Sequence, residues 1–387
     1  MRTTESSEHF AARLAEIAFA SIGVGLVVCA IAANQRWLDR HFLSDFFYAR
    51  EDVVRVEAKV RITIAVAGTL LALLIRRPLA RFLVHDPLRT LFTFAALIAS
   101  FCAAELVLQQ SRLRAKEEVA TRFEPSRHLD PRLGWLFVTP HVGFQKNNGR
   151  LIQYAFDRNG YRVGHVDEPV DPTLPTILFS GESMMVGEKL HWEETIPAQT
   201  GQLLGIQSAN VAVSGFATDQ AYLRLKDELP RFRHPVAVVM LFSPALFDRN
   251  FDDDRPHLGP GLIWLPAERR WRLAFIARRL VRYRSNEAIE RGVAGTREVL
   301  RATVELALAR GAVPLILVPE FRAEEPGERM LRARILDEPG LPYVRVELDP
   351  TWRILNDGHP DPRAAHAIAV AIAERLRAPM KTASRSD

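Results

Sequence analysis

The chain has 387 residues, 48% hydrophobic and 25% charged, a composition that excludes a disordered or collagen-like protein. Its 51 basic and 46 acidic residues leave a net charge of +5, too small an excess to indicate nucleic-acid binding. The mean hydropathy of −0.03 excludes a protein that lies mostly within a membrane, but it is compatible with an apolar end joined to a soluble body. The two cysteines, Cys29 and Cys102, lie in apolar stretches, which excludes a disulfide framework or a cysteine zinc site in that body.

The first third of the chain contains three apolar runs. Residues 17–33 carry no charge, residues 62–75 form a shorter run between two arginines, and residues 90–108 are interrupted only by Glu105. A membrane span needs about 20 mostly apolar residues, with about 17 at the low end. Three buried helices of a soluble bundle are the alternative, although such helices normally carry a polar stripe. We predict a transmembrane anchor over residues 1–112, with helices at about 15–36, 60–77 and 89–109.

The arginines between the runs predict the orientation of this anchor. The short link between the second and third runs holds four arginines and one acidic residue, Asp86. Such a link stays on the cytoplasmic side of a membrane. The N-terminus is then also cytoplasmic, and everything after the third run is exported. The arginines are Arg76, Arg77, Arg81 and Arg89.

The rest of the chain has the pattern of an α/β domain. We predict a linker and β-rich lead-in over residues 113–172, an α/β domain over 173–380 and a polar tail over 381–387. Near-continuous apolar strands that alternate with helices indicate a parallel sheet covered on both faces, a three-layer α/β/α arrangement. The predicted strands are 151–156 in the lead-in, then 176–180, 208–213, 236–242, 313–318 and 343–346. The predicted helices are 194–204, 219–228, 286–310 and 362–377.

A serine follows the first strand of this domain. Ser183 stands in the stretch Phe179-Ser-Gly-Glu-Ser-Met-Met-Val-Gly187, at the edge where parallel sheets bind ligands. A tight turn here would expose its hydroxyl and direct its backbone N–H outward, as a nucleophile with its own oxyanion donor requires. The alternative is a serine that only caps the following helix.

A histidine beside a carboxylate precedes the last helix. His359 and Asp357 stand in Leu355-Asn-Asp-Gly-His-Pro-Asp361. Together they could supply a general base and the group that orients it. A loop histidine beside a capping aspartate is the alternative.

Taken together, these segments resemble the SGNH (GDSL-type) hydrolase family, over roughly residues 174–378. Gly181-Glu182-Ser183 stands where that family has Gly-Asp-Ser, and the pair before the last helix matches its Asp–His block. Residues 210–220 match the second block, in which the resemblance gives the backbone N–H of Gly215 to the oxyanion hole. The lead-in, with Leu133-Gly-Trp and Asp157-Arg-Asn-Gly-Tyr-Arg162, resembles that of bacterial membrane-tethered members.

The sequence departs from the family in two blocks. Ala245 stands about where the third block has an asparagine that donates to the oxyanion, and Asn250 or Arg249 is the candidate substitute. Loss of one such donor typically costs about 10²–10³ in rate. The family aspartate lies three residues before the histidine, where this chain has Asn356, so Asp357 is the expected orienting carboxylate. An asparagine cannot supply the charge that stabilises an imidazolium.

The resemblance implies a serine esterase or O-acyltransferase that acts on ester bonds of envelope glycans or lipids. Ser183, His359 and Asp357 would be catalytic, and Ser183 and Gly215 would stabilise the oxyanion. It also implies a multi-pass protein of a bacterial inner membrane, with this domain on the periplasmic side. The alternative is a weakened module of the same fold that binds a glycan or a membrane partner. Neither a metal motif nor a phosphate- or dinucleotide-binding fingerprint occurs, so no cofactor is expected.

One further segment is rich in arginine. Residues 268–284 hold seven arginines against one glutamate, with apolar residues between them. Such a segment could rest on an anionic membrane surface. The alternative is an ordinary helix packed on the sheet with its arginines in solvent.

Overall fold

The computed structural model describes residues 2–44, 46, 50–111, 118–119, 123–251, 254–268, 271–273 and 282–383. The chain divides into two compact units, described here one at a time. Residues 1–112 and 270–289 form the first unit, and residues 113–269 and 290–387 form the second. The first unit therefore includes a late return of the chain that the sequence did not indicate.

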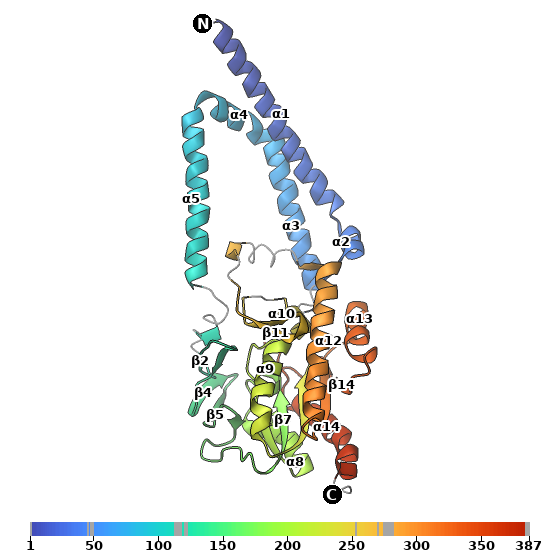
Figure 1. Ribbon diagram of the computed structural model, residues 1–387. Coiled ribbons are helices and arrows are strands. Elements are labelled where there is room, and N and C mark those ends of the chain that lie inside the picture. Colours follow the sequence, from blue (N-terminus) through green and yellow to red (C-terminus); the bar gives the residue numbers. More distant parts are fainter. Residues whose placement is uncertain are drawn as a thin grey trace. The chain divides into compact units, whose positions relative to one another are not determined.

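Long helices dominate the first unit (Figure 1). Three of the described helical stretches, His9–Ala32, Arg50–His85 and Pro87–Gln109, are long and apolar enough to cross a membrane. They match the three predicted runs, except that the first stretch ends at Ala32, one residue before the end of its run. The second is longer than predicted because helix continues on both sides of the apolar stretch. The elements in order are α1 (Arg2–Ala32), α2 (Gln35–His41), β1 (Phe42–Ser44), α3 (Arg50–Leu70), the π-helical turn η1 (Leu71–Ile75), α4 (Arg76–His85) and α5 (Pro87–Ser111).

Helices α1 and α3 pack backbone against backbone at two glycines. A Cβ atom on Gly23 would lie 2.6 Å from the carbonyl oxygen of Gly68, and one on Gly68 would lie 2.6 Å from the carbonyl oxygen of Gly23. Close approach through small residues is how helices associate in lipid, where side-chain burial gives little driving force. Farther along the same pair, Arg61 Nε donates to the carbonyl oxygen of Ala30 at 2.8 Å.

The late return of the chain adds polar contacts to the first unit. Its strand β12 (Tyr283–Ser285) pairs antiparallel with β1. The hydroxyl of Tyr283 accepts from Gln35 at 2.6 Å and from Arg50 at 3.1 Å. Residues 269–270 and 274–281 lie outside the described residues, and with them most of the arginine-rich segment 268–284.

The acidic residue in the third apolar run also contacts this return. Glu105 is 5% exposed. Its carboxylate accepts from the backbone N–H groups of Arg272 at 2.5 Å and Leu273 at 2.9 Å. Paired donors of this kind satisfy a carboxylate near the end of an otherwise apolar helix.

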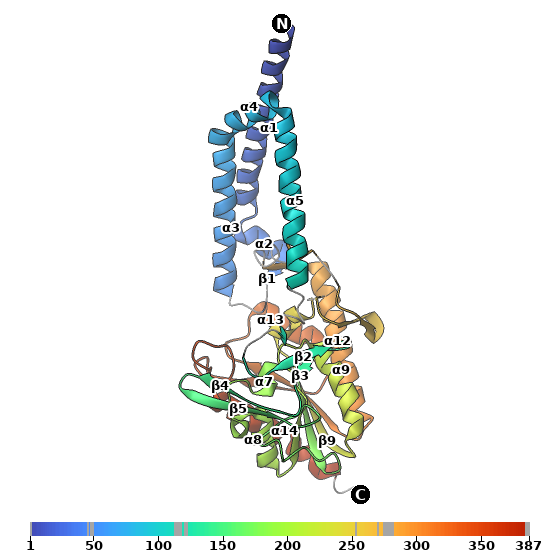
Figure 2. The same ribbon diagram turned by 90° about the vertical axis from the view of Figure 1, so that its left-hand side faces the viewer.

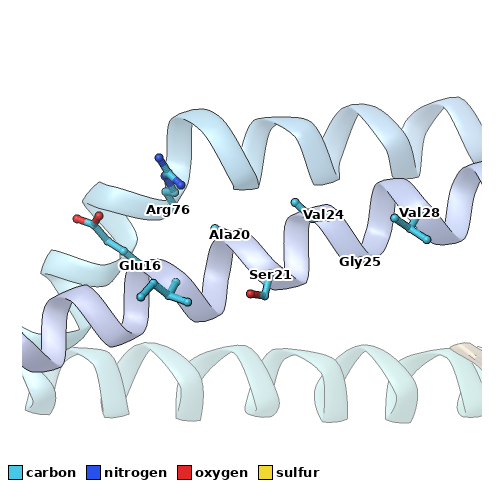
Figure 3. Close-up of a pocket in the computed structure, with 8 residues that line it drawn as sticks. Glu16, Ala20, Ser21, Val24, Gly25, Val28 and Arg76 are labelled. Atoms are coloured by element: carbon cyan, nitrogen blue, oxygen red, sulfur yellow. The ribbon is translucent and has the colours of Figure 1, made fainter.

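An open groove of about 550 Å³ runs along α1 (Figure 3). Apolar and small side chains of α1 line most of it, and Glu16 and Arg76 lie at one end. The groove contains none of the predicted site residues.

The second unit is built on an eight-stranded sheet with the strand order β14-β13-β9-β7-β8-β6-β5-β4. The first five strands in this order are parallel, and the last three pair antiparallel. The predicted parallel sheet is therefore confirmed, and the lead-in extends it at one edge. The strands are β4 (His141–Asn147), β5 (Arg150–Phe156), β6 (Arg162–Val163), β7 (Pro175–Ser180), β8 (Gln207–Asn210), β9 (His234–Leu241), β13 (Val313–Glu320) and β14 (Tyr343–Glu347).

Helices cover both faces of this sheet (Figure 2), as the sequence predicts. On one face, Leu178 and Val238 of the central strands share a buried cluster with Leu225 of α9 and Ala307 of α12. Helices α8 and α14 pack together, and α14 contacts β13 and β14. The principal helices are α8 (Ile196–Leu204), α9 (Thr218–Glu228), α12 (Asn286–Leu308) and α14 (Pro362–Ala383).

Shorter elements complete the second unit. Two antiparallel pairs lie outside the main sheet: β2 with β3, and β10 with β11. The strands are β2 (Arg127–Asp130), β3 (Gly134–Phe137), β10 (His257–Gly259) and β11 (Ile263–Leu265). The short helices are α7 (Ser183–Val186), α10 (Pro244–Arg249) and α13 (Pro326–Arg332), with the turns η2 (Trp192–Glu194), η3 (Leu229–Arg231), η4 (Pro260–Leu262) and η5 (Ala333–Asp337).

Candidate active site

Ser183 is the first residue of α7, directly after the carboxyl end of β7. The turn between them requires a glycine, because Gly181 has φ +156° and a Cβ atom there would lie 2.7 Å from Cβ of Leu241. Glu182, not the serine, caps the helix: its side chain accepts from the backbone N–H of Met184 at 3.1 Å. The alternative interpretation, in which the hydroxyl of Ser183 caps this helix, is therefore wrong.

The loop before α14 places the predicted histidine against this serine. His359 Nε2 lies 2.7 Å from Ser183 Oγ. Its other ring nitrogen, Nδ1, is hydrogen-bonded to Asp357 Oδ1, which also accepts from the backbone N–H of His359 at 2.8 Å. The structure thus brings together Ser183, His359 and Asp357, residues separated by up to 176 positions in the chain. The carboxylate that contacts the ring is Asp357, as expected from the departure at Asn356.

A second carboxylate reaches the same hydroxyl. Glu182 Oε2 lies 2.5 Å from Ser183 Oγ, and Arg249 Nη1 donates to that carboxylate oxygen at 3.1 Å. The serine has one proton and two acceptors in range. When His359 is protonated, Nε2–H donates to Oγ and the hydroxyl donates to Glu182. When His359 is neutral, the hydroxyl can donate to Nε2 and be activated.

Burial and charge act against each other at these three ionisable groups. Burial disfavours a charged His359, but the hydrogen bond to Asp357 and the charges of Glu188 and Glu182 outweigh it and raise the pKa of His359. Burial likewise opposes charge on Glu182, yet Arg249 and His359 hold the pKa of this carboxyl below its usual value. The pKa of Asp357 is strongly lowered, because bonds from His359 and Lys189 outweigh its burial. Glu182 and Asp357 are therefore held ionised.

The loop after α7 supplies two charged residues that sequence reasoning missed. The ammonium group of Lys189 pairs with Asp357 Oδ2, the oxygen that His359 leaves free. The carboxylate oxygen Oε2 of Glu188 lies 3.7 Å from His359 Nε2. No sequence motif marks either residue, and their proximity in sequence to Ser183 was the only available signal.

A fully buried arginine holds this loop in place. Arg162, 1% exposed, donates to the backbone carbonyl oxygens of Val186 at 2.7 Å, Gly187 at 2.5 Å and Leu190 at 2.6 Å. Its guanidinium group also lies over the ring of Tyr154, 4.6 Å from the centroid. Burial lowers the pKa of Arg162 to about 10. The arginine of the lead-in thus positions the segment that carries Glu188 and Lys189.

The backbone N–H groups of the two predicted oxyanion donors are not used elsewhere among the described residues. In the described part of the chain, the N–H groups of Ser183 and Gly215 donate to no other group. Two side-chain hydrogen bonds hold the backbone at Gly215 in place. Arg255 donates to the carbonyl oxygen of Gly215 at 2.7 Å, and Trp135 donates to that of Ser214 at 2.9 Å. Its φ of +80° is a conformation that favours glycine.

Asn250, a candidate substitute for the family asparagine, has both ends of its amide hydrogen-bonded within the domain. Its Oδ1 accepts from the backbone N–H of Thr218 at 3.2 Å, and its Nδ2 donates to Thr296 at 2.8 Å. Both ends of the amide therefore link α9 to α12. Asn250 is the first residue after α10, which ends at Arg249. Ala245 lies within α10, and the other candidate, Arg249, contacts Glu182 and the carbonyl oxygen of Phe216.

Within the described ranges, no group of three or more His, Cys, Asp or Glu side chains is arranged to hold a metal ion. The site as described consists of a serine, a histidine and carboxylates with their cationic partners. Such a set can transfer a proton from a hydroxyl and can form a covalent bond to an electrophilic carbon.

No protein-family model matches the sequence, and a search of curated proteins finds no match. Solved structures with a similar fold include esterases and a lipase. An acetyl xylan esterase from the rumen bacterium Butyrivibrio proteoclasticus is 11% identical, with a TM-score of 0.35, over 55% of this chain and 66% of its own. A family two carbohydrate esterase from Cellvibrio japonicus is 13% identical, with a TM-score of 0.34, over 55% of this chain and 64% of its own.

A GDSL-like lipase from Bacteroides thetaiotaomicron is 16% identical, with a TM-score of 0.31, over 52% of this chain and 87% of its own. The chain spans slightly less than two thirds of the length of the two carbohydrate-active esterases. Likenesses this remote do not assign an activity to this chain, which has to be argued from its own residues.

Proposed function

We propose that this protein is a membrane-anchored serine esterase or O-acyltransferase of the SGNH type. The observation that carries the proposal is the hydrogen-bonded series Ser183 Oγ, His359 Nε2, His359 Nδ1 and Asp357 Oδ1. A nucleophile, a base and an orienting carboxylate in this order are the requirements of acyl transfer through a covalent intermediate.

The first half of the reaction acylates the serine. Neutral His359 takes the hydroxyl proton at Nε2 while Oγ of Ser183 attacks the ester carbonyl carbon. The carbonyl oxygen becomes an oxyanion within reach of the N–H groups of Ser183 and Gly215. As the intermediate collapses, the ester C–O bond breaks, and His359 returns its proton to the leaving alcohol. Asp357 holds the ring and stabilises the imidazolium that forms in between.

The second half releases the acyl group. His359 takes a proton from water, or from the hydroxyl of an acceptor, and the resulting oxygen nucleophile attacks the acyl carbon. The bond to Oγ breaks, and Ser183 regains its proton from His359. Water gives a carboxylic acid and an alcohol acceptor gives a new ester, so hydrolysis and transfer use the same residues.

We assign the substrate class from the family resemblance and from the anchor. Three helices long and apolar enough to cross a membrane precede the domain. The arginines at and after Arg76 support a cytoplasmic link, which puts the domain on the exported side of a bacterial inner membrane. O-acyl groups on envelope glycans or lipids are the ester bonds that a domain so placed would meet.

Covalent labelling of the full-length chain, purified in detergent, tests the proposed chemistry. A fluorophosphonate probe should label the wild type, and Ser183→Ala and His359→Ala should abolish labelling. Ser208→Ala is the matched control, because its hydroxyl donates to the carbonyl oxygen of Pro197 and lies outside the site. If the folded wild type is never labelled and hydrolyses no activated ester, the proposed enzymatic function is wrong.

One observation favours a second candidate, a module that binds rather than catalyses. The proposed oxyanion site would depend on two backbone donors, because the family asparagine is absent and the amide of Asn250 is engaged elsewhere. Such a module would bind a glycan or a membrane partner. It would retain ligand binding in Ser183→Ala and would show no labelling in the wild type.

Reporter fusions test the orientation. An alkaline phosphatase fused after Asp387 should be active, since that enzyme folds correctly only after export, and the same reporter fused after Arg81 should be inactive. The reverse pattern contradicts the proposed topology without bearing on the chemistry of Ser183.

A further inference from the structure

A carboxylate from outside the sheet lies against the candidate oxyanion donor. Glu118 belongs to the second unit and stands between α5 and β2 in the chain. The position that a Cβ atom on Gly215 would take is 2.9 Å from Oε2 of Glu118 and 3.0 Å from Oε1. The carboxylate of Glu118 therefore fills the space beside the residue whose N–H would meet a substrate oxyanion.

A nearly buried arginine holds this carboxylate. Arg127 Nη1 pairs with Oε2 of Glu118, and Nη2 lies 3.3 Å from Oε1 of Glu188. The side chain of Arg127 is 9% exposed, and its Nε is buried with no hydrogen-bond partner in the described part of the chain. The guanidinium group has thus lost most of its water and depends on carboxylates for compensation.

The two carboxylates on Arg127 belong to different parts of the site. Glu188 follows α7 and lies 3.7 Å from His359 Nε2. Glu118 precedes the lead-in and belongs to no strand of the sheet. The carboxylate of Glu118 fills the space on the Cβ side of Gly215, so a substrate that occupies this space has to exchange with it. After that exchange Arg127 is left with one carboxylate, unless the substrate brings its own.

We propose that Arg127 recognises a carboxylate on the substrate, close to the scissile ester, and that Glu118 occupies this subsite when no substrate is bound. A guanidinium group and a carboxylate form parallel charge-assisted hydrogen bonds, a pairing that a neutral ester cannot supply. The inference rests on the proposed function, and it narrows the substrate class to acidic molecules, such as an ester on a uronic acid or a dicarboxylic acid half-ester.

Matched pairs of esters test this on the full-length chain in detergent. One pair places the acid on the acyl side, 4-nitrophenyl hydrogen succinate against 4-nitrophenyl butyrate. The other places it on the alcohol side, 4-acetoxybenzoate against its methyl ester. The measured quantity is the ratio of kcat/KM for the acidic ester to kcat/KM for the neutral ester of a pair. The intrinsic reactivity of each ester is the same for every variant, so it cancels when this ratio is compared between variants.

Arg127→Gln should lower the acid-to-neutral ratio of at least one pair about tenfold, the value of a hydrogen bond to a charged group. Arg127→Lys keeps the positive charge but not the two parallel N–H donors of the guanidinium group, so it should retain part of the preference for the acidic ester. Arg132→Gln is the matched control, since Arg132 lies in the same lead-in and pairs with Asp227 instead. It should leave both ratios unchanged. Unchanged ratios in both Arg127 variants overturn the proposal.

Glu118 provides a test that leaves Arg127 intact. Glu118→Gln weakens the internal competitor, so KM for the acidic esters should fall while kcat changes little. A KM that stays the same or rises contradicts the exchange. Fluorophosphonate labelling and ester hydrolysis separate the two levels of inference: a folded wild type that is neither labelled nor active on any activated ester rejects the proposed function. Labelling retained in Arg127→Gln with unchanged ratios rejects only the role of Arg127.

Discussion

The carboxylate of Glu188 lies 3.7 Å from Nε2 of His359, on the nitrogen that faces Ser183. A negative charge there favours the protonated imidazole, and Glu182 and Asp357 act in the same direction. His359 has to be neutral to act as the proposed general base, so this arrangement would delay activation of Ser183 to higher pH. Each of these carboxylates also pairs with a cation: Asp357 with Lys189, Glu188 with Arg127 and Glu182 with Arg249.

The pH dependence of the reaction follows from this contact. A raised pKa means that His359 loses its proton only above its ordinary value of about 6.5, so kcat/KM should rise with pH through a point above that value. Glu188→Gln removes a charge that stabilises the imidazolium, so the rise should move to lower pH. Glu193→Gln, at an exposed position on the next turn, serves as the control. A profile that Glu188→Gln leaves unmoved, or moves upward, would contradict this assignment.

Asn250→Ala should affect stability more than chemistry. The amide of Asn250 joins the backbone of Thr218 to the side chain of Thr296, and its loss leaves buried partners unsatisfied. Each such group costs about 1–3 kcal/mol, so the apparent melting temperature should fall while turnover per folded molecule stays close to that of the wild type. If turnover instead fell by about two orders of magnitude at unchanged stability, Asn250 would have the role of the family asparagine.

Arg162→Met should loosen the loop that carries Glu188 and Lys189. The substitution leaves the carbonyl oxygens of Val186, Gly187 and Leu190 without their donor, at a cost of about 1–3 kcal/mol each. We expect a lower melting temperature and also a shift in the pH profile toward that of Glu188→Gln. Arg150→Met, which removes a partly exposed pair with Glu194, is the control for loss of an arginine in the lead-in. A drop in stability with an unshifted profile would mean that Arg162 supports the fold but not the position of Glu188.

The helix contact at Gly23 should be intolerant of any side chain. A Cβ atom on Gly23 meets the backbone of Gly68 and Ala72 at 2.6 and 2.7 Å, whereas a Cβ atom on Gly25 meets nothing within 4 Å. Gly23→Leu should therefore separate α1 from α3 and lower the melting temperature of the detergent-solubilised protein, by an overpacking cost of about 1–3 kcal/mol. Gly25→Leu, two residues away on the same helix, should change little. Equal effects of the two substitutions would show that α1 and α3 do not meet at Gly23.

Much of the fold follows from local sequence patterns. The five parallel strands were predicted because each is a short apolar run between helical segments, and a run of this kind indicates its element without knowledge of its neighbours. The boundaries moved by a few residues: the second predicted strand of the α/β domain, 208–213, ends at Asn210, although Val211 and Val213 still donate to the carbonyl oxygens of Phe179 and Gly181. The proximity of Ser183 to His359 could also be anticipated, since the carboxyl ends of parallel strands meet at one edge of the sheet.

The sequence by itself thus determined the α/β body, the three apolar helices and the candidate trio of Ser183, His359 and Asp357. Only the tertiary structure decided which of many charged side chains join that trio. No motif marks Lys189 or Glu188, the resemblance in the lead-in gives Arg162 no partner, and the amide of Asn250 bonds to Thr296, 46 residues away. Periodicity and spacing describe residues close together in the chain, whereas the partner of a buried charge is set by what the folded backbone brings within hydrogen-bond distance.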